Sequence, residues 1–469
     1  MEQYDIAIVG AGAAGLIAAD FALRLGVRVV MLEKDRIGGD CTWTGCVPSK
    51  SLLRVASVAH MAKLAERVGL GLKVEPVNLA EVREYLRRTI AQIYAPTEPE
   101  SLRARGLDVC VGPTKFVDAH TLQCGEQRLE AKKILIATGA TPKAPAIAGI
   151  ERVQYETYLT IFENARLPEH LLVVGGGPVG CEVAQAYRRL GARVTVIAPR
   201  LLAAEDEDAS AMLREVFEGE GVEVVPAMAE EVRGEGDAVE VRAGERRMQG
   251  DMLLVAVGRT PAVEGLGLEQ AGVRYSERGI VVNEQLQTMV PHIYAAGDVI
   301  GGPQYSHLAG WQGFQAVRNA MMPGKSQGKA EVLPRVTFTS PEVAHVGLTE
   351  AQARAKYGDE LVTRSMLLSK IDRAVNEDDR VGMVKMHATR GGEIVGATMV
   401  AERAGEAITE IALAMRNRIS LKDLASTVHP YPTYNSGIQM LATQMVLDTA
   451  FSGIRGKVLR ALARRTSRR

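Results

Sequence analysis

Two segments of this sequence repeat one another, and the repeat limits the chain to an α/β fold. Tyr4–Glu33, YDIAIVGAGAAGLIAADFALRLGVRVVMLE, matches Glu169–Ala198, EHLLVVGGGPVGCEVAQAYRRLGARVTVIA, at an offset of 165 residues. Each copy predicts a short apolar strand, a glycine turn, a helix closed by glycine, and a second apolar strand. The same glycines recur in the two copies: Gly10, Gly12 and Gly15, then Gly175, Gly177 and Gly180.

The spacing Gly-x-Gly-x-x-Gly between a strand and a helix is typical of dinucleotide binding. The first glycine permits a tight turn, the second lets the backbone approach a pyrophosphate, and the third lets the helix pack closely on the strand. The N-terminus of the helix then faces the phosphate charge. Two glycine turns without a ligand are the alternative, and the retention of all three glycines in both copies disfavours it.

The two copies differ where their second strands end. The first ends at Glu33, whereas the second ends at Ala198 and continues with Pro199 and Arg200. A carboxylate suits the ribose hydroxyls of a dinucleotide, while a missing acid and a nearby arginine suit a 2′-phosphate. We interpret the first site as an FAD site and the second as an NADPH site. NADH is the alternative for the second site, with Arg200 then a solvated loop residue.

Two cysteines follow the first repeat, in the segment GGDCTWTGCVPSK at residues 38–50. Cys41 and Cys46 precede a predicted helix, whose N-terminus favours a thiolate, so we expect one sulfur with a lowered pKa. The alternatives are two buried free thiols or a pair of metal ligands. No further Cys or His stands nearby at ligand spacing, so no metal site is expected. Structural roles are expected for the other cysteines: Cys110, Cys124 and Cys181.

With these features the chain resembles the pyridine nucleotide-disulfide oxidoreductase family, which includes glutathione reductase, dihydrolipoamide dehydrogenase and mercuric reductase. The resemblance covers nearly the whole chain. It rests on four further motifs: ILIATG at 134–139, DMLLVAVGRTP at 251–261, TMVPHIYAAGD at 288–298 and PRVTFTSPEVAHVGLT at 334–349. It implies two Rossmann-like dinucleotide-binding domains and a C-terminal α+β dimerisation domain in a homodimer. The expected segments are 1–150 and 272–330 for FAD, 151–271 for NAD(P), and 331–469 for the interface.

The family resemblance also implies roles for single residues. Cys41 would be the thiol that attacks the acceptor, and Cys46 the thiol that receives electrons from the flavin. Lys50 and Glu182 would form an ion pair beside the flavin ring. Electrons would pass from NADPH to the flavin, then to the Cys41–Cys46 disulfide, and then to a small acceptor. The motifs place further residues at the cofactors: Gly39, Thr138, Gly139, Gly258, Arg259 and Asp298. Of these, Asp298 would hold the ribityl chain of the flavin.

The chain departs from the disulfide reductases near its end. Where they carry a His that acts as acid and base for the partner's thiol, HPYPTYNSG places Tyr431, and Ser436 stands where the orienting Glu belongs. A Tyr with a pKa of ~10 is a poor proton shuttle at neutral pH compared with a His at ~6.5. A Tyr here is similar to mercuric reductase. His429, two positions away, is expected to be structural or to support the site.

Mercuric reductases also carry a C-terminal Cys pair and, in some cases, an N-terminal metal-binding domain. No Cys follows Cys181, and the first glycine repeat begins at Tyr4, so the resemblance is to a form without either. The leading hypothesis is therefore an NADPH-dependent flavoenzyme that reduces a small acceptor: a thiophilic metal such as Hg(II), a disulfide or persulfide, or a quinone. The alternatives are a dihydrolipoamide dehydrogenase with His429 as base, and a non-catalytic redox sensor that acts through a partner.

Composition and charge limit the binding partners and the cellular location that we expect. Lys plus Arg and Asp plus Glu each number 56, so the net charge is zero and a protein that coats nucleic acid is not expected. Five Cys in 469 residues do not make a secreted disulfide framework, and MEQYDIAIVGAG shows no secretory signal, so a cytoplasmic location is predicted. Residues 455–469 hold seven basic and no acidic residues. This tail predicts either a solvated end or contact with an anionic membrane or an acidic partner.

Overall fold

The computed structural model describes residues 2–72, 75–236, 238–379, 381–451 and 453–467. The chain divides into two compact units. The first, called here the flavin unit, comprises Met1–Gly175, Arg189–Arg193 and Ala229–Ala330. The second, called here the interface unit, comprises Gly176–Arg188, Val194–Met228 and Glu331–Arg469. The division into FAD, NAD(P) and interface segments made from the sequence remains a prediction.

The flavin unit is built on a seven-stranded sheet with the order β3-β2-β1-β6-β5-β4, and β18 lies beside β6. β1, β2, β3, β6 and β18 are parallel, with Ile6 opposite Val29 and Lys133, whereas β4 and β5 run antiparallel. Every residue of β2 is buried, as expected for a parallel strand covered on both faces. The bounds are β1 Glu2–Val9, β2 Val29–Glu33, β3 Asp108–Val111, β4 Thr114–Phe116, β5 Thr121–Cys124, β6 Gln127–Ile136 and β18 Ile293–Ala295.

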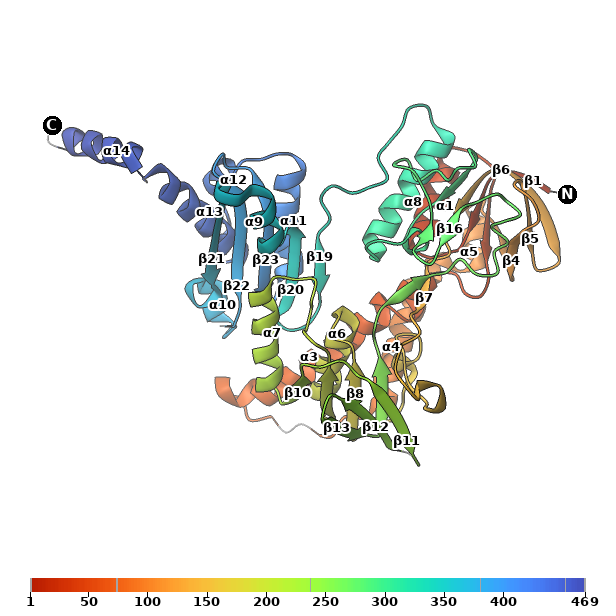
Figure 1. Cartoon of the computed structure of the whole chain (residues 1–469), viewed down its shortest axis with the longest axis horizontal. Coiled ribbons are helices and arrows are strands. Elements are labelled where there is room, and N and C mark those ends of the chain that lie inside the picture. The colour runs from red at the N-terminus through yellow and green to blue at the C-terminus, as the bar shows by residue number, and fades with distance from the viewer. Residues whose placement is uncertain (1, 73–74, 237, 380, 452, 468–469) are drawn as a thin grey trace. The chain divides into compact units, whose positions relative to one another are not determined.

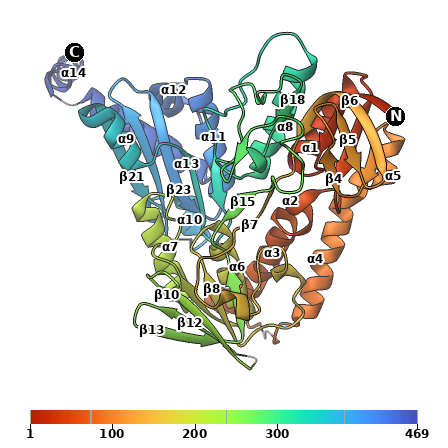
Figure 2. The same cartoon turned by 45° about the vertical axis from the view of Figure 1, so that its right-hand side comes forward.

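Small residues let the helices of this unit approach one another. α1 (Ala13–Arg24) and α8 (Ser306–Met321) lie side by side (Figure 1). A Cβ on Gly313 of α8 would lie 2.1 Å from the carbonyl oxygen of Ala14, so only glycine permits this contact. α3 (Cys46–Leu64), the helix predicted after the cysteines, runs beside α4 (Leu79–Tyr94), as Figure 2 shows. The other helices of the unit are α2 Gly39–Trp43 and α5 Pro99–Ala104.

Shorter strand pairs complete the flavin unit. β8 and β14 are parallel, β11, β12 and β13 form an antiparallel meander, and β7 pairs with β15. A two-residue ladder joins β16 and β17. The bounds are β7 Ala140–Pro142, β8 His170–Val174, β11 Glu231–Glu235, β12 Ala238–Ala243, β13 Arg246–Gly250, β14 Met252–Val255, β15 Arg259–Pro261, β16 Tyr275–Ser276 and β17 Gly279–Ile280.

The interface unit contains a five-stranded antiparallel sheet with the order β19-β20-β23-β22-β21. All eight residues of β23 are buried, and helices α11 and α13 pack against the sheet (Figure 1). The same unit holds the parallel pair β9 and β10 and the helices α6 and α7. The strand bounds are β9 Arg193–Ile197, β10 Val222–Val225, β19 Arg335–Thr337, β20 Glu342–Gly347, β21 Leu361–Leu367, β22 Met383–Thr389 and β23 Ile394–Ala401. The helix bounds are α6 Pro178–Leu190, α7 Glu207–Gly219, α9 Glu350–Tyr357, α10 Asp372–Asn376, α11 Ala404–Arg416, α12 Leu421–Ser426, α13 Asn435–Ala450 and α14 Gly453–Thr466.

In the part of the chain that the structure describes, no helix combines the length and the apolar character needed to span a bilayer.

Candidate active site

The first glycine turn leaves an open space at its second glycine. A Cβ on Gly10, whose φ is +105°, would lie 2.3 Å from the carbonyl oxygen of Ala137, and one on Gly15 would lie 1.9 Å from that of Gly10. By contrast, a Cβ on Gly12 would meet nothing closer than Gly39 Cα, at 4.0 Å. Gly10 and Gly15 are therefore required by packing, and so is Gly39, where a Cβ would lie 2.8 Å from Gly12 Cα. Gly12 alone of these four borders free space at the N-terminus of α1. An anion such as a pyrophosphate fits there.

Glu33 holds the glycine turn from the end of β2. One carboxylate oxygen accepts a hydrogen bond from Ala11 N at 2.8 Å, and the other accepts one from Asp35 N at 3.0 Å. The side chain is buried. Each oxygen retains a second lone pair, so Glu33 remains able to accept from a ribose hydroxyl, as the sequence predicts.

Thr138 and Gly139 join the end of β6 to the segment after β15. Thr138 Oγ1 donates to Ala262 O at 2.8 Å, and Ala262 N donates to Gly139 O at 3.0 Å. Gly139 has a φ of +75°, a conformation that favours glycine. This motif therefore ties the end of β6 to the segment after β15.

A charged cluster links the cysteine motif to Asp298, the last residue of the motif TMVPHIYAAGD. Arg259 Nη1 donates to Asp298 Oδ2 at 2.6 Å, and its Nη2 is bonded to Asp40, the residue before Cys41. Tyr158 OH donates to Asp40 Oδ2 at 3.0 Å. Burial raises the pKa of Asp298, although the Arg259 charge opposes it. Asp298 and Arg259, both expected at the cofactor, thus lie together, with Asp40 and Tyr158 as partners.

The second glycine turn repeats the geometry of the first. A Cβ on Gly175, with a φ of +121°, would lie 2.3 Å from Ala256 O, the same close approach as at Gly10. A Cβ on Gly177 would meet nothing within 4 Å, as at Gly12, and Gly180 is buried at the start of α6. The second copy therefore has the same free space for a phosphate group.

The loop after β9 contacts this turn. A Cβ on Gly176 would lie 2.7 Å from Arg200 O and 2.8 Å from Ala198 Cβ. Arg200 is exposed, and its guanidinium is bonded to Ala203 O. An exposed arginine at this position remains able to bind a phosphate group.

The two motif cysteines are free thiols in contact with each other. Cys41 lies in α2 and Cys46 is the first residue of α3, with Cys46 Sγ 3.4 Å from Ser306 Oγ at the start of α8. A hydrogen bond with Cys46 and burial raise the pKa of Cys41. Cys41 therefore holds its proton more strongly than an ordinary thiol, while the N-terminus of α3 favours a thiolate at Cys46. The expected lowered pKa does not apply to Cys41.

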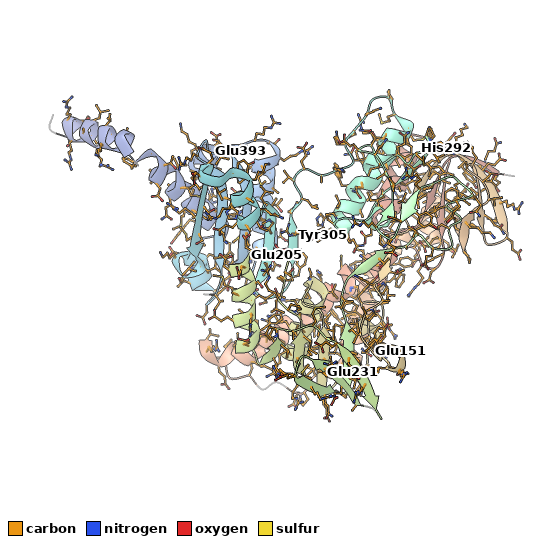
Figure 3. All side chains as sticks on the ribbon, in the orientation of Figure 1. Glu151, Glu205, Glu231, His292, Tyr305 and Glu393 are labelled. Carbon is orange, nitrogen blue, oxygen red and sulfur yellow. The ribbon has the colours of Figure 1, made fainter. Side chains whose placement is uncertain are left out.

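Figure 3 labels Tyr305, which directly precedes α8 and this serine. Trp43, between the two cysteines, packs on Tyr94 with ring centroids 4.8 Å apart and donates to Ile37 O at 2.8 Å. Its side chain is thus engaged in packing.

Tyr431 and His429 have different surroundings in the interface unit. Tyr431 is 74% exposed and its hydroxyl donates to Asp372. His429 Nε2 lies 2.5 Å from Glu410 Oε1, and its Nδ1 lies 2.9 Å from Thr427 O. His429 is therefore held by a carboxylate, while Tyr431 projects from the surface.

Lys50 lies on α3 one turn after Cys46, and Glu182 lies on α6, where its Oε1 accepts from Phe338 N at 3.0 Å. Their ion pair remains a prediction.

Comparison with known proteins assigns the family. Residues 4–322 match the pyridine nucleotide-disulphide oxidoreductase model, and residues 333–442 match the dimerisation domain of the same family. The chain belongs to the pyridine nucleotide-disulphide oxidoreductases. It is 37% identical to mercuric reductase from Streptomyces lividans over 95% of this chain and 97% of the relative. It is 34% identical to dihydrolipoyl dehydrogenase from Thermus scotoductus over 94% and 97% of the two chains.

Among solved structures, the Cu(II) complex of the HOCl-induced flavoprotein disulfide reductase RclA from Escherichia coli is similar, with a TM-score of 0.85. It is 26% identical, and the match covers 95% of this chain and all of that one. The predicted fold class is therefore confirmed, with dinucleotide-binding and dimerisation domains. Members of this family contain FAD and use NAD(P)H, and the free space at Gly12 and Gly177 suits a phosphate group of each dinucleotide.

Sequence reasoning missed several residues that contact the predicted ones within each unit. They are Asp40, Tyr158, Ser306 and Glu410. Asp40 carries a signal, since it is the acid inside the cysteine motif. Tyr158 and Ser306 lie 118 and 260 residues from their partners, and Glu410 lies 19 residues from His429. No local pattern marks any of the three.

Proposed function

We propose that this chain is an NADPH-dependent flavoenzyme that reduces a thiophilic metal ion, of the class of Hg(II), at Cys41 and Cys46. The observation that carries the proposal is the thiol pair itself. Cys41 and Cys46 share a hydrogen bond at the N-terminus of α3, and Ser306 lies at 3.4 Å from Cys46. The relatives named mercuric reductase support this acceptor class.

The chain supplies a site in which two sulfurs hold a soft ion. Hg(II) prefers thiolates, so it displaces the proton of Cys41 and binds to both sulfurs. The net reaction is NADPH + Hg(II) → NADP⁺ + H⁺ + Hg(0), a two-electron reduction. The first glycine turn, open at Gly12, would hold FAD, which would supply the two-electron chemistry between the nicotinamide and the sulfurs. The protein positions the sulfurs and lets Cys46 carry the charge.

The surroundings of Tyr431 disfavour rapid exchange with organic disulfides. The hydrogen bond to Asp372 raises the pKa of Tyr431 above its usual value. A hydroxyl with a raised pKa holds its proton at neutral pH, so it is a poor base for a thiol. A metal ion needs no proton from such a group to leave as a neutral atom.

The preference for NADPH rests on the loop after β9. Ala198 puts no negative charge beside a 2′-phosphate, and Arg200 is an exposed residue whose backbone oxygen lies beside Gly176 of the second glycine turn. We expect a kcat/KM for NADPH that exceeds that for NADH. A strong preference for NADH would contradict this assignment.

Anaerobic titration of the purified protein with NADPH tests the thiol pair, followed in the visible spectrum. The wild type should develop a long-wavelength thiolate-to-flavin band that Cys46→Ser abolishes. Cys181→Ser, which changes a buried cysteine in α6, is the matched control and should keep the band. NADPH oxidation is then compared with Hg(II), Cu(II), lipoamide and a quinone as acceptors. Turnover of lipoamide alone would contradict the proposed acceptor.

A specific observation favours a second function, that of a dihydrolipoamide dehydrogenase. His429 is hydrogen-bonded to Glu410, and Asn435 Nδ2 donates to the other oxygen of that carboxylate at 2.6 Å. A His oriented by a carboxylate is suited to acid–base catalysis. Under this function, His429→Gln abolishes lipoamide turnover while Tyr431→Phe leaves it intact. The opposite pattern excludes it.

We also propose that the basic tail contacts an anionic membrane surface. α14 presents exposed Val458, Leu459 and Leu462 beside the exposed Lys457, Arg460, Arg464 and Arg465. Two further arginines, Arg468 and Arg469, lie outside the described residues. Apolar and basic side chains together favour anionic lipid. The full chain should co-sediment with phosphatidylserine-containing vesicles more than a chain that ends at residue 454. Equal binding by both would dismiss this contact.

A further inference from the structure

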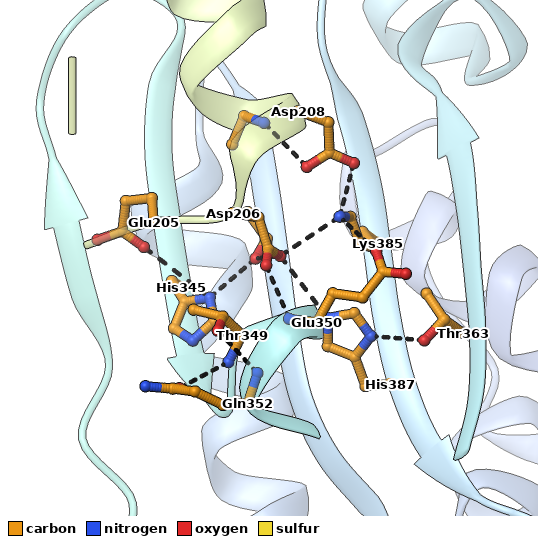
Figure 4. A network of polar contacts seen from close by, with 12 residues as sticks. Glu205, Asp206, Asp208, His345, Thr349, Glu350, Gln352, Thr363, Lys385 and His387 are labelled. Atoms are coloured by element: carbon orange, nitrogen blue, oxygen red, sulfur yellow. Dashed lines mark hydrogen bonds and ion pairs between the residues drawn. The ribbon is translucent and has the colours of Figure 1, made fainter. Parts of the chain in front are cut away.

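A buried charged cluster joins the loop after β9 to the sheet of the interface unit (Figure 4). Asp206 lies at its centre and is 4% exposed. Its Oδ2 accepts from Thr398 Oγ1 on β23 at 2.7 Å and lies 3.5 Å from Lys385 Nζ on β22. Its Oδ1 accepts from Glu350 N, at the start of α9, at 2.8 Å. One carboxylate is thus held by two strands and a helix.

The side chain of Asp206 does not cap its own helix. Asp206 is the N-cap residue of α7, where an Asp normally accepts from the backbone of its own helix. Its side chain makes no such bond and instead turns to Thr398 and Glu350 N. The carboxylate therefore fixes the start of α7 to the sheet.

The one buried lysine of this cluster lies within ion-pair distance of three carboxylates. Lys385 is buried and pairs with Asp208 Oδ2 at 2.6 Å and Glu350 Oε2 at 3.0 Å. Burial would raise the pKa of Asp206, but His387, Thr398, the Glu350 amide and Lys385 outweigh it and hold the pKa below its usual value. Neutralising Asp206 would weaken its contacts with Thr398 and the Glu350 amide, which join α7 to the sheet and to α9.

The loop that precedes Asp206 is held at two further points. Leu202 N donates to Gly176 O of the second glycine turn at 2.7 Å, and Leu202 has a φ of +45°, which is uncommon for leucine. At the other end, Arg335 Nε on β19 pairs with Glu205 Oε1 at 2.7 Å, and its Nη2 donates to Ala204 O at 3.1 Å. Figure 3 labels Glu205 in this loop. The segment that carries Arg200 is thus fixed to the glycine turn at one end and to the sheet at the other.

We propose that Asp206 and Arg335 are positioning residues that hold Arg200 where it binds the 2′-phosphate of the dinucleotide. Neither side chain touches the nucleotide in this role. The anchors hold the loop whose backbone at residues 200–202 lies against Gly176, so that the exposed Arg200 would reach a 2′-phosphate of a dinucleotide bound at Gly177. This inference rests on the proposed NADPH site. Under this inference, the sheet of the dimerisation domain contributes to nucleotide affinity together with the second glycine turn.

Calorimetric binding of adenosine 2′,5′-bisphosphate to the holoenzyme tests the inference without any turnover. Asp206→Asn and Arg335→Gln should each weaken its binding about fivefold or more, as for residues that act on a ligand without contact. In steady state, KM for NADPH should rise while kcat changes little. Arg364→Gln, which breaks the exposed pair with Asp448 in the same unit, is the matched control and should bind like the wild type.

A double-variant cycle separates positioning from general damage. If the anchors act through Arg200, Asp206→Asn should weaken binding much less in an Arg200→Ala background. Binding within twofold of the wild type by folded Asp206→Asn would overturn the inference, as would an equal effect in both backgrounds. If Asp206→Asn does not accumulate as folded protein, Thr398→Val, which removes one hydrogen bond from the same carboxylate, is measured by the same criteria.

The ligand also distinguishes this inference from the proposed function. Equal affinity of the wild type for 5′-AMP and adenosine 2′,5′-bisphosphate would contradict the NADPH assignment and, with it, the role of Arg200. If the wild type binds the bisphosphate more tightly than 5′-AMP and the Asp206 and Arg335 variants bind it equally well, the NADPH assignment stands. Only the positioning role of Asp206 and Arg335 would then be contradicted.

Discussion

At the scale of single residues, burial sets the protonation of several groups in the interface unit. His345 is fully buried, and burial together with the Arg335 charge lowers its pKa to about 4. Glu342 shows the opposite shift, because burial raises its pKa to about 7 against a hydrogen bond from Gly405 N. The folded protein therefore favours the neutral form of both side chains.

These shifts predict opposite effects of pH on stability. For His345, the unfolded chain binds the proton first as the pH falls below 6.5, so folding stability falls by about 2 kcal/mol between pH 7 and pH 5. His345→Gln should lose this part of the pH dependence, measured by urea unfolding at both pH values. An unchanged slope would contradict the shift.

Glu342 provides the matched comparison. Its folded form retains a proton between pH 4.5 and 7, so its contribution to stability falls as the pH rises through that window. Glu342→Gln, which keeps an acceptor for Gly405 N, should therefore gain stability relative to the wild type at pH 8 and little at pH 4.5. The same urea series measures this difference.

At the scale of elements, the glycine turns were predictable from the sequence, because their spacing expresses a purely local requirement. The helix after the cysteines is likewise local, and α3 begins at Cys46 itself. The partners of Asp40 and His429 were not predictable in this way. Tyr158 and Glu410 reach them only through the tertiary fold, and their own neighbours in sequence give no sign of it.

Gly10 and Gly12 of the first glycine turn predict different effects of substitution, one on folding and one on flavin binding. Gly12→Ala adds a methyl group into free space, so the protein should fold but retain less FAD after purification. Gly10→Ala places that methyl group 2.3 Å from Ala137 O, so it should lower the yield of folded protein. Flavin absorbance per protein and the melting temperature measure the two effects. Full flavin content in Gly12→Ala would contradict the assignment of this space to the pyrophosphate.

At the scale of the whole molecule, the dimerisation domain implies that some apolar surface is covered by a second copy. The interface unit exposes large apolar side chains, with Val428 at 91% and Met440 at 44%. Exposed apolar groups of this size mark contact surfaces when they gather. The sequence indicated the dimer through family resemblance alone, because no periodic pattern distinguishes a surface that meets a partner from one that meets solvent.

Sedimentation equilibrium should therefore give a mass of about twice the chain mass of 50.5 kDa. Val428→Asp should shift the protein toward the monomer, because a charge placed in an apolar contact has to be desolvated. Val68→Asp, at a similarly exposed valine of the flavin unit, is the control and should stay dimeric. A monomeric wild type would contradict the expectation.

Two helices, α3 and α8, begin where Cys46 and Ser306 meet. The positive ends of both backbone dipoles therefore converge on one sulfur and favour its anion. Stabilising that anion stabilises the reduced pair relative to the disulfide, which makes the couple a milder reductant. In the absence of an acceptor, the two cysteines of the enzyme should therefore remain reduced. Binding of the acceptor, rather than of NADPH, should begin each catalytic cycle.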